Sequence, residues 1–297
     1  MQQLSQNEFD KISPTALLVA YARTFTDIHY TKQLSEAVNS QSVVEGLLGQ
    51  KLEEVAEITV LIESRYRSID RAIAILKSKK TSKNNSGQIL EIASGLLPRG
   101  MIMSEDTSLR FVETDLPLMI EQKANLVKVL VGDRLNLHFK PVDITALSNH
   151  LKDCIELLDR NQPVIILSEG LLMYLTHAQK QQAFANVREL LELFGGVWIT
   201  TDLVTVKAIN RRKQISPGLG QISQMVSRLS DRPIGDTYFQ DTEQIEDFIT
   251  VQGFKCDRTP VLSLINLDQL NCLHSLNINP EIAEAILSDA YVYSLSV

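Results

Sequence analysis

The chain has 297 residues, 44% of them apolar, and carries a formal net charge of -7 with an isoelectric point near 5.3. This length suits one large α/β core or two small domains, and we interpret it as one domain with helical additions. The acidic balance argues against a nucleic-acid partner, because binding to that backbone needs clustered Lys and Arg. A basic partner or a small substrate fits the charge better.

Nothing in the sequence indicates export or a membrane partner. The first residues, MQQLSQNEFDK, lack the basic and apolar regions of a signal peptide. No apolar run approaches the ~18 residues needed to cross a bilayer. We therefore expect a cytoplasmic protein. Cys154, Cys256 and Cys272 form no CxxC pair, so we expect buried free thiols and neither a disulfide framework nor a metal site.

The N-terminal part of the chain has helical periodicity. Apolar residues between Val44 and Leu76 recur at intervals of three, four or seven, which predicts one long amphipathic helix, or two separated near Gly49. The polar run KSKKTSKNNSG that follows predicts a loop. We expect residues 1–85 to form a helical cap over an α/β core made by residues 86–297.

After that loop, short apolar strands alternate with amphipathic helices, a pattern typical of βαβ units and a parallel sheet. The expected strands are 88–93, 109–113, 137–142, 163–167 and 197–201, and the expected helices are 117–131, 144–159 and 177–193. In the second helix, Leu147, Leu151, Ile155 and Leu158 would share one face. Right-handed crossovers would then place helices on both sides of the sheet.

Residues 204–236 do not continue the alternation. They hold Pro217, Gly218, Gly220, Pro233 and Gly235 around a short helical segment, which favours an inserted lid. Beyond them we expect a helix at 242–252 and strands at 253–260 and 290–297. These two last strands are separated by a long intervening segment, which favours an antiparallel edge pair on an otherwise parallel sheet.

An acidic residue follows each strand from the second to the fifth, namely Asp115, Asp143, Glu169 and Asp202. In open α/β sheets the ligand crevice lies outside the carboxyl ends of the strands. For any one of these acids taken singly, a helix cap is the favoured explanation. Asp202, for example, either contacts a ligand or merely ends its strand. Together the four acids indicate a binding site.

The first strand runs into the turn ILEIASGLLPRG, where Gly95 lets the backbone approach a ligand closely. A dinucleotide fingerprint needs three glycines, at positions that here hold Ala93, Gly95 and Pro98, so diphosphate binding is disfavoured. An adenosyl ligand without phosphates needs a tight turn, a carboxylate for the ribose hydroxyls and a polar group for the adenine amine. Asp115 and Asp143 stand where those acceptors are required.

These motifs resemble the leucine carboxyl methyltransferase family, which includes bacterial polyketide-type O-methyltransferases. The segment ILEIASG at 89–95 is similar to the family's strand and turn ending in G-A-G, and ETDLP at 113–117 with Lys123 is similar to E-V-D-x-P with a following Lys. The pair at 143–144 resembles the adenine-contacting D-L, and EGLLMYL at 169–175 resembles E-C-x-L-V-Y-M. ETDLP followed by EGLLMYL is the specific part.

The resemblance implies a class I methyltransferase with S-adenosylmethionine as cofactor. The implied fold is α/β and Rossmann-like, with a doubly wound, mostly parallel seven-stranded sheet, an N-terminal helical layer and the lid insertion. The implied cofactor-binding residues are Arg65, Ala93, Gly95, Asp115, Asp143, Ile144 and Glu169. Of these, Gly95 would line the cofactor, Asp115 would hold the ribose hydroxyls, and Asp143 with Ile144 would bracket adenine.

At the methionine end, Glu169 would lie near the amino-acid part of the cofactor. Arg65 would bind its carboxylate, because a guanidinium forks onto a carboxylate. Two alternatives stay open, a surface role for Arg65 and the use of Arg67 instead. Arg23 is a candidate for a Lys that some members place near the N-terminus. The sequence departs from the family at Ala93, where the first Gly is expected, and at Leu97, where an Asp is usual.

The expected reaction is O-methylation of a carboxylate, or a hydroxyl, in a small molecule or peptide. A carboxylate acceptor is ionised at pH 7 and needs no general base. Candidate donors to it are Tyr174, Arg99, Tyr238 and Arg232, with Tyr174 the expected substrate-positioning residue. Its alternative role is a core aromatic. The alternative functions are an NAD-dependent oxidoreductase and a non-catalytic adenosyl-ligand-binding protein of this fold.

Overall fold

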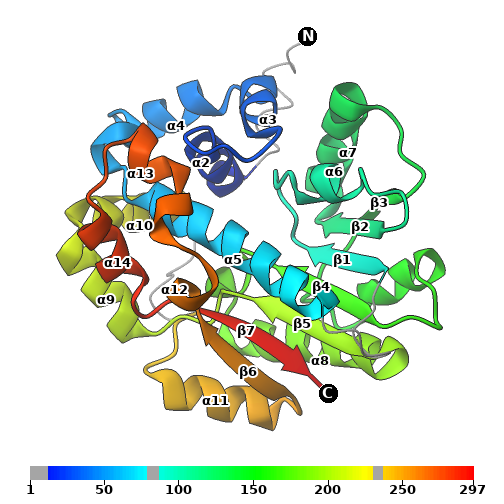
Figure 1. Ribbon diagram of the computed structural model, residues 1–297. Coiled ribbons are helices and arrows are strands. Elements are labelled where there is room, and N and C mark those ends of the chain that lie inside the picture. The colour runs from blue at the N-terminus through cyan, green and yellow to red at the C-terminus, as the bar shows by residue number, and fades with distance from the viewer. Residues whose placement is uncertain (1–12, 79–86, 230–236) are drawn as a thin grey trace.

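The computed structural model describes residues 13–78, 87–229 and 237–297, in which seven strands form one sheet in the order β3-β2-β1-β4-β5-β7-β6 (Figure 1). The strands are β1 (Gln88–Ile92), β2 (Arg110–Asp115), β3 (Leu137–Pro141), β4 (Val164–Ser168), β5 (Gly196–Thr200), β6 (Lys255–Pro260) and β7 (Tyr291–Ser296). β1 to β5 pair in parallel, and β7 runs antiparallel between β5 and β6. The doubly wound, mostly parallel sheet is thus confirmed, with each strand end within two residues of its predicted place.

Helices cover both faces of the sheet (Figure 1). The longer ones are α2 (Pro14–Arg23), α3 (Thr31–Ala37), α4 (Ser40–Leu48), α5 (Ile58–Ser78), α7 (Pro117–Val131), α8 (His177–Phe194), α9 (Val206–Ile215), α10 (Pro217–Leu229), α11 (Thr242–Val251) and α14 (Pro280–Leu287). The shorter ones are α6 (Arg99–Met103), α12 (Val261–Leu264) and α13 (Asn271–Ser275), with 3-10 turns η1 (Leu52–Val55), η2 (His150–Leu157), η3 (Leu172–Tyr174) and η5 (Leu267–Gln269). No described helix is long and apolar enough to span a bilayer.

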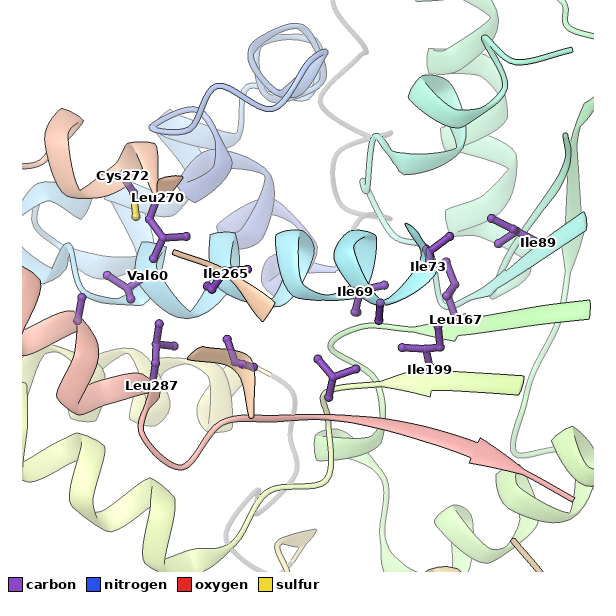
Figure 2. Close-up of a cluster of buried hydrophobic side chains, with 14 of the residues drawn as sticks. Val60, Ile69, Ile73, Ile89, Leu167, Ile199, Ile265, Leu270, Cys272 and Leu287 are labelled. Atoms are coloured by element: carbon purple, nitrogen blue, oxygen red, sulfur yellow. The ribbon is translucent and has the colours of Figure 1, made fainter. Parts of the chain in front are cut away.

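The core forms two layers because neighbouring residues in a buried parallel strand point to opposite faces. In β1, Ile89 packs into the layer that contains α5, and Leu90 packs into the layer that contains α8. Figure 2 shows Ile69 and Ile73 of α5 close to Leu167 and Ile199 of the sheet. α5 therefore belongs to the sheet's own core.

The break expected near Gly49 is present. Gly49 ends α4 in the left-handed conformation, with φ at 68°, a conformation that costs glycine little. η1 then leads into α5, which carries the remaining apolar positions of the predicted stripe. Most of the polar run after α5, residues 79–86, lies outside the described residues.

Three expectations are wrong. Residues 144–159 hold only the 3-10 turn η2, and Leu147 is 90% exposed, because the segment is too short and too tightly wound to keep four leucine-type positions on one face. Residues 204–229 contain two helices, α9 and α10, where one short helical segment was expected. Cys256 is exposed because β6 is an edge strand, whereas Cys154 and Cys272 are buried as expected.

A lysine in α8 is almost fully buried. Lys180 is 1% exposed, and its Nζ donates to the carbonyls of Leu175 at 2.6 Å and Thr237 at 2.5 Å. It therefore joins α8 to the segment after β4 and to the chain that returns from the lid. Burial lowers the pKa of Lys180 to about 8, and Asp202 opposes that shift.

Replacing Ile69 by Ala should lower the free energy of unfolding by about 2 to 5 kcal/mol, because it leaves a cavity between α5 and the sheet. Ile69 is fully buried, whereas Leu193 is 44% exposed. Leu193→Ala is the matched control and should cost less than about 1 kcal/mol. Urea unfolding measures both values, and equal losses would show that α5 is not part of the sheet's core.

Lys180→Met should remove a pH dependence of stability. The folded-state pKa near 8 lies below the value of about 10.4 in an unfolded chain. Between these values the unfolded state binds more protons, so wild-type stability rises with pH across this window, by up to about 3 kcal/mol. Urea unfolding at the two ends of the window should show a smaller rise for Lys180→Met than for wild type. The exposed control, Lys207→Met, should keep the wild-type rise, and an unchanged rise in Lys180→Met would contradict the assignment.

Candidate functional site

The four predicted acids gather at one edge of the sheet. Asp115, Asp143, Glu169 and Asp202 follow β2, β3, β4 and β5, or end them, and these parallel strands lie within one run of neighbours that also contains β1. Parallel strands present their carboxyl ends on the same side, so the four acids share that side. Their side chains, however, bind different partners, so each acid stabilises a different segment at this edge.

The turn after β1 is held to the end of β2 by one carboxylate. Ala93 and Gly95 are left-handed, with φ at 53° and 47°. The N–H of Gly95 donates to Oδ2 of Asp115 at 2.8 Å, and the N–H of Leu116 donates to Oδ1 at 2.7 Å. Burial raises the pKa of Asp115, although both N–H groups favour its ionised form. Each carboxylate oxygen retains room to accept another hydrogen bond.

Lys123 explains why the ETDLP motif is followed by a lysine. Its Nζ reaches back from α7, forms an ion pair with Glu113 and donates to the carbonyl of Ser94 at 3.2 Å. Lys123 and Glu113 are both fully buried. Burial raises the pKa of Glu113 to about 7 against the opposing charge of Lys123. The pair fixes the turn after β1, and neither residue is available to a ligand.

The segment after β3 is ordered from two sides. Oδ1 of Asp143 accepts from the N–H and the hydroxyl of Thr145, at 2.8 and 2.7 Å. Asn186 of α8 donates to the carbonyls of Ile144 and Ala146. Ile144 is 6% exposed. These contacts thus hold the apolar side chain of Ile144 and the carboxylate of Asp143 next to the end of β2.

Glu169 lies in a buried network of charges at the end of β4. Arg23 of α2 donates to its Oε1 at 2.7 Å, and Arg99 donates to its Oε2 at 2.9 Å. Burial alone would raise the pKa of Glu169, but Arg23, Arg99 and Arg65 together lower it. Arg99 also binds Asp70 and Glu91. The sequence prediction that Arg99 could donate to an acceptor is therefore wrong, because Arg99 is fully buried and committed to three carboxylates.

Asp202 clamps the EGLLMYL segment. Its carboxylate accepts three backbone N–H groups, from Gly170 at 2.8 Å, Leu171 at 2.7 Å and Leu172 at 3.1 Å. Asp202 is 2% exposed, and burial raises its pKa against these hydrogen bonds and the charge of Arg65. Asp202 does more than end β5, because it fixes the turn that presents Tyr174.

Arg65, Tyr174, Asp202 and Tyr238 line a cavity of about 140 Å³ beside this edge. Ala93, Gly95, Asp115, Asp143, Ile144 and Glu169 are not among the residues that line this cavity. Burial raises the pKa of Tyr174, and the charge of Arg65 opposes that shift. Tyr174 thus stands at the cavity as expected. Arg232, another candidate donor, lies outside the described residues.

Arg65 is an unusual cation in this region. Its Nε is buried without a hydrogen-bond partner, and its Nη1 makes only a long contact of 3.9 Å with Sδ of Met173. Arg67, the alternative raised from the sequence, is instead engaged by Glu63 and Asp27. Arg65 therefore has donors to spare for a ligand, whereas Arg67 is paired on the protein surface.

The sequence did not reveal the cavity or the buried guanidinium of Arg212 in its wall. Arg212 of α9 lines the cavity and forms a salt bridge with Asp289 at 3.0 Å. Arg212 is 8% exposed, although its segment RRKQ looks like a solvated helix face. Only the docking of α9 against α14 buries it, and no local pattern signals that contact.

Comparison with known proteins places this geometry in a family. Residues 20–188 match the leucine carboxyl methyltransferase family. A DUF574 family protein from Streptomyces avermitilis MA-4680 is 15% identical, with a TM-score of 0.56 over 95% of this chain and 96% of that one. A candidate methyltransferase from Thermobifida fusca YX is also 15% identical, with a TM-score of 0.53 over 98% and 97%. At this identity the two structures establish the fold alone.

A candidate O-methyltransferase from Nostoc punctiforme PCC 73102 is 12% identical, with a TM-score of 0.44, and the match covers 95% of this chain and 66% of that protein. The family match, by contrast, spans more than half of the 297 residues and includes the turn after β1, the ETDLP motif and the EGLLMYL segment. The chain therefore belongs to the leucine carboxyl methyltransferase family and is an S-adenosylmethionine-dependent methyltransferase.

Proposed function

We propose that the protein methylates a carboxylate oxygen of a small molecule or peptide. The observation that carries this proposal is a cavity that adjoins the ends of β4 and β5 and is lined by Tyr174 and Tyr238, because a tyrosine hydroxyl group can donate a hydrogen bond to a carboxylate. Arg65, a cation without an ion pair, lines the same cavity and favours the carboxylate of the cofactor as its ligand. A carboxylate is ionised at pH 7, so this acceptor needs no general base and we assign that role to no residue.

The residues at the strand ends fit the adenosine part of the cofactor. The left-handed turn at Ala93 and Gly95 lets the backbone approach a ligand, although the Ala93 methyl must also fit there. Asp115 would accept from the ribose hydroxyls with the lone pairs that Gly95 and Leu116 leave free. Asp143 and Ile144 would bracket adenine. No phosphate is needed at any of these positions.

The methionine part would lie toward Glu169 and Arg65. Arg65 would bind its carboxylate in bidentate fashion, using donors that have no protein partner. Glu169 would accept from its amino group, since each of its oxygens accepts one arginine hydrogen bond and has a second lone pair. Arg23 holds Glu169 in place from α2. The methionine part of the cofactor would thus lie between the carboxylate of Glu169 and the guanidinium of Arg65, which has no ion pair.

Methyl transfer is an in-line displacement, in which the protein aligns the acceptor about 3 Å from the methyl carbon and excludes water. When bound, the cofactor supplies the methyl group on a sulfonium. The acceptor oxygen forms a bond to the methyl carbon while the carbon–sulfur bond breaks, and the bonding electrons pass to sulfur. A carboxylate acceptor loses no proton. Tyr174, presented by the Asp202 clamp, would position the acceptor through its hydroxyl group.

Calorimetric titration with S-adenosylmethionine, S-adenosylhomocysteine and NAD tests the binding part of the proposal. We expect the two sulfur compounds to bind in the micromolar to low millimolar range and NAD not to bind. Formation of S-adenosylhomocysteine in the presence of a carboxylic acid tests the reaction. Binding without turnover on any acid would favour the alternative of a non-catalytic adenosyl-ligand-binding protein, and preferential NAD binding would favour an oxidoreductase.

Asp115→Ala should weaken the binding of S-adenosylhomocysteine by about 10- to 150-fold, because a hydrogen bond to a charged group contributes roughly 1.5 to 3 kcal/mol. The matched control is Asp133→Ala, whose carboxylate is 79% exposed and lies outside the proposed site. The control should bind like wild type. Circular dichroism of each variant checks that the fold is retained, and unchanged affinity in folded Asp115→Ala would remove the ribose assignment.

A further inference from the structure

Thr201, the first residue after β5, carries a buried hydroxyl group without a partner. The residue is 8% exposed, and its Oγ1 has no hydrogen-bond partner among the described residues. A buried hydroxyl group in this state is unfavourable, because it has lost its hydrogen bonds to water and gained none in the protein. Such a group in a folded protein therefore needs an explanation.

The other buried threonines show that this state is unusual for the chain. Oγ1 donates to a backbone carbonyl, at 2.6 to 3.1 Å, in Thr26, Thr31, Thr59, Thr114 and Thr237. In Thr200, the residue before Thr201, Oγ1 accepts from the N–H of Asp202 at 3.3 Å. Within the described parts of the chain, Thr201 is thus the one buried threonine whose hydroxyl group makes no hydrogen bond.

Thr201 lines the same cavity as Tyr174 and Tyr238. The hydroxyl group of Thr237 donates to the backbone carbonyl that precedes Tyr174, at 2.6 Å, so the chain segments that carry the two tyrosines are held together. Tyr174 interacts electrostatically with Tyr238 and also with Asp202, which follows Thr201 in the chain. Three residues with hydroxyl groups therefore meet at this cavity from three segments of the chain.

The order of the strands places Thr201 on the methionine side of the cofactor. In the proposed function, adenine lies at the end of β3, the ribose at the end of β2, and the methionine part near Glu169 after β4. The next strand of the sheet is β5, and neighbouring strands lie about 4.8 Å apart. The end of β5 is therefore the farthest of these strand ends from adenine. A polar group there suits the acceptor, which reacts at the sulfonium of the methionine part.

We propose that Thr201 binds the methyl acceptor, by donating a hydrogen bond from its hydroxyl group to the acceptor carboxylate. This inference rests on the proposed function and adds a residue to its acceptor site. A carboxylate has about four lone-pair positions, so it can accept from Thr201 and Tyr174 and still attack the methyl carbon. A hydrogen bond from a neutral donor to a charged acceptor is strong without an ion pair, and Arg65 remains with the carboxylate of the cofactor.

The inference predicts that one substitution has opposite effects on stability and on activity. Valine has the shape of threonine without the hydroxyl group, so Thr201→Val removes the unpaired polar atom from its buried position. The protein without ligand should become more stable, with a Tm higher by about 2 to 4 °C. A hydroxyl group that serves only the fold would give a lower Tm when removed.

The activity measurement uses S-adenosylmethionine with four carboxylate probes and S-adenosylhomocysteine formation as the readout. The probes are hexanoate, decanoate, benzoate and a peptide that ends in leucine, and the probe with the highest kcat/KM is used for the variants. Thr201→Val should raise the KM for this probe about ten-fold or more. The kcat should stay within about three-fold, because the carboxylate already carries its full charge before the reaction. The Kd for S-adenosylhomocysteine should stay within about two-fold.

Two control variants separate this role from a structural one. Thr201→Ser keeps the hydroxyl group and should bring the KM back to within about three-fold of wild type. Thr59→Val is the matched control, because Thr59 is fully buried, does not line the cavity, and donates to the carbonyl of Ala56 at 2.6 Å. It should lower the Tm and leave the KM unchanged. Circular dichroism of each variant checks that the fold is retained.

The outcomes distinguish this inference from the proposed function. A lower Tm in Thr201→Val would show that the hydroxyl group already has a partner in the ligand-free protein, and would overturn the inference. An unchanged KM would also overturn it, and so would a rise in the Kd for S-adenosylhomocysteine, which would assign Thr201 to the cofactor. Turnover with none of the four probes would instead overturn the proposed function.

Discussion

Glu169 holds the N-terminal helices against the ligand edge of the sheet. Its two carboxylate oxygens bind Arg23 from α2 and Arg99 from the start of α6, so one side chain at the end of β4 connects three separate segments. All three charges are buried. Removing one partner from such a network is strongly destabilising, because it leaves an uncompensated charge. The position of α2 over the sheet, and hence one wall of the cavity, depends on this contact.

The buried network also gives Arg65 its significance. Arg23 and Arg99 are neutralised by Glu169, Glu91 and Asp70, and Lys123 is neutralised by Glu113. Against this background, a guanidinium without an ion pair stands out as a place where a ligand can complete the balance. Arg65 lines the cavity that adjoins the ends of β4 and β5.

The convergence of the four acids at one edge of the sheet was predictable from the sequence, for a simple geometric reason. Parallel strands end on the same side, so acids that follow consecutive strands come together whatever their separation in the chain. The limits are equally physical. An Asp after a strand looks the same whether it caps a helix or, like Asp202, accepts three N–H groups from a neighbouring loop. Arg99 was misjudged because the convergence of Glu91, Asp70 and Glu169 on it is a property of packing.

The sequence by itself determined the alternation of strands and helices, the tight turn at Gly95 and the family, because each is written in local periodicity or in a short motif. The failure at residues 144–159, where Leu147 faces solvent, shows how far periodicity alone can be trusted. Only the tertiary structure decided the cavity beside Arg65, the buried state of Lys180 and the pairing of Arg23 with Glu169, which are 146 positions apart. These features arise from contacts between distant segments, and a local pattern carries no record of such contacts.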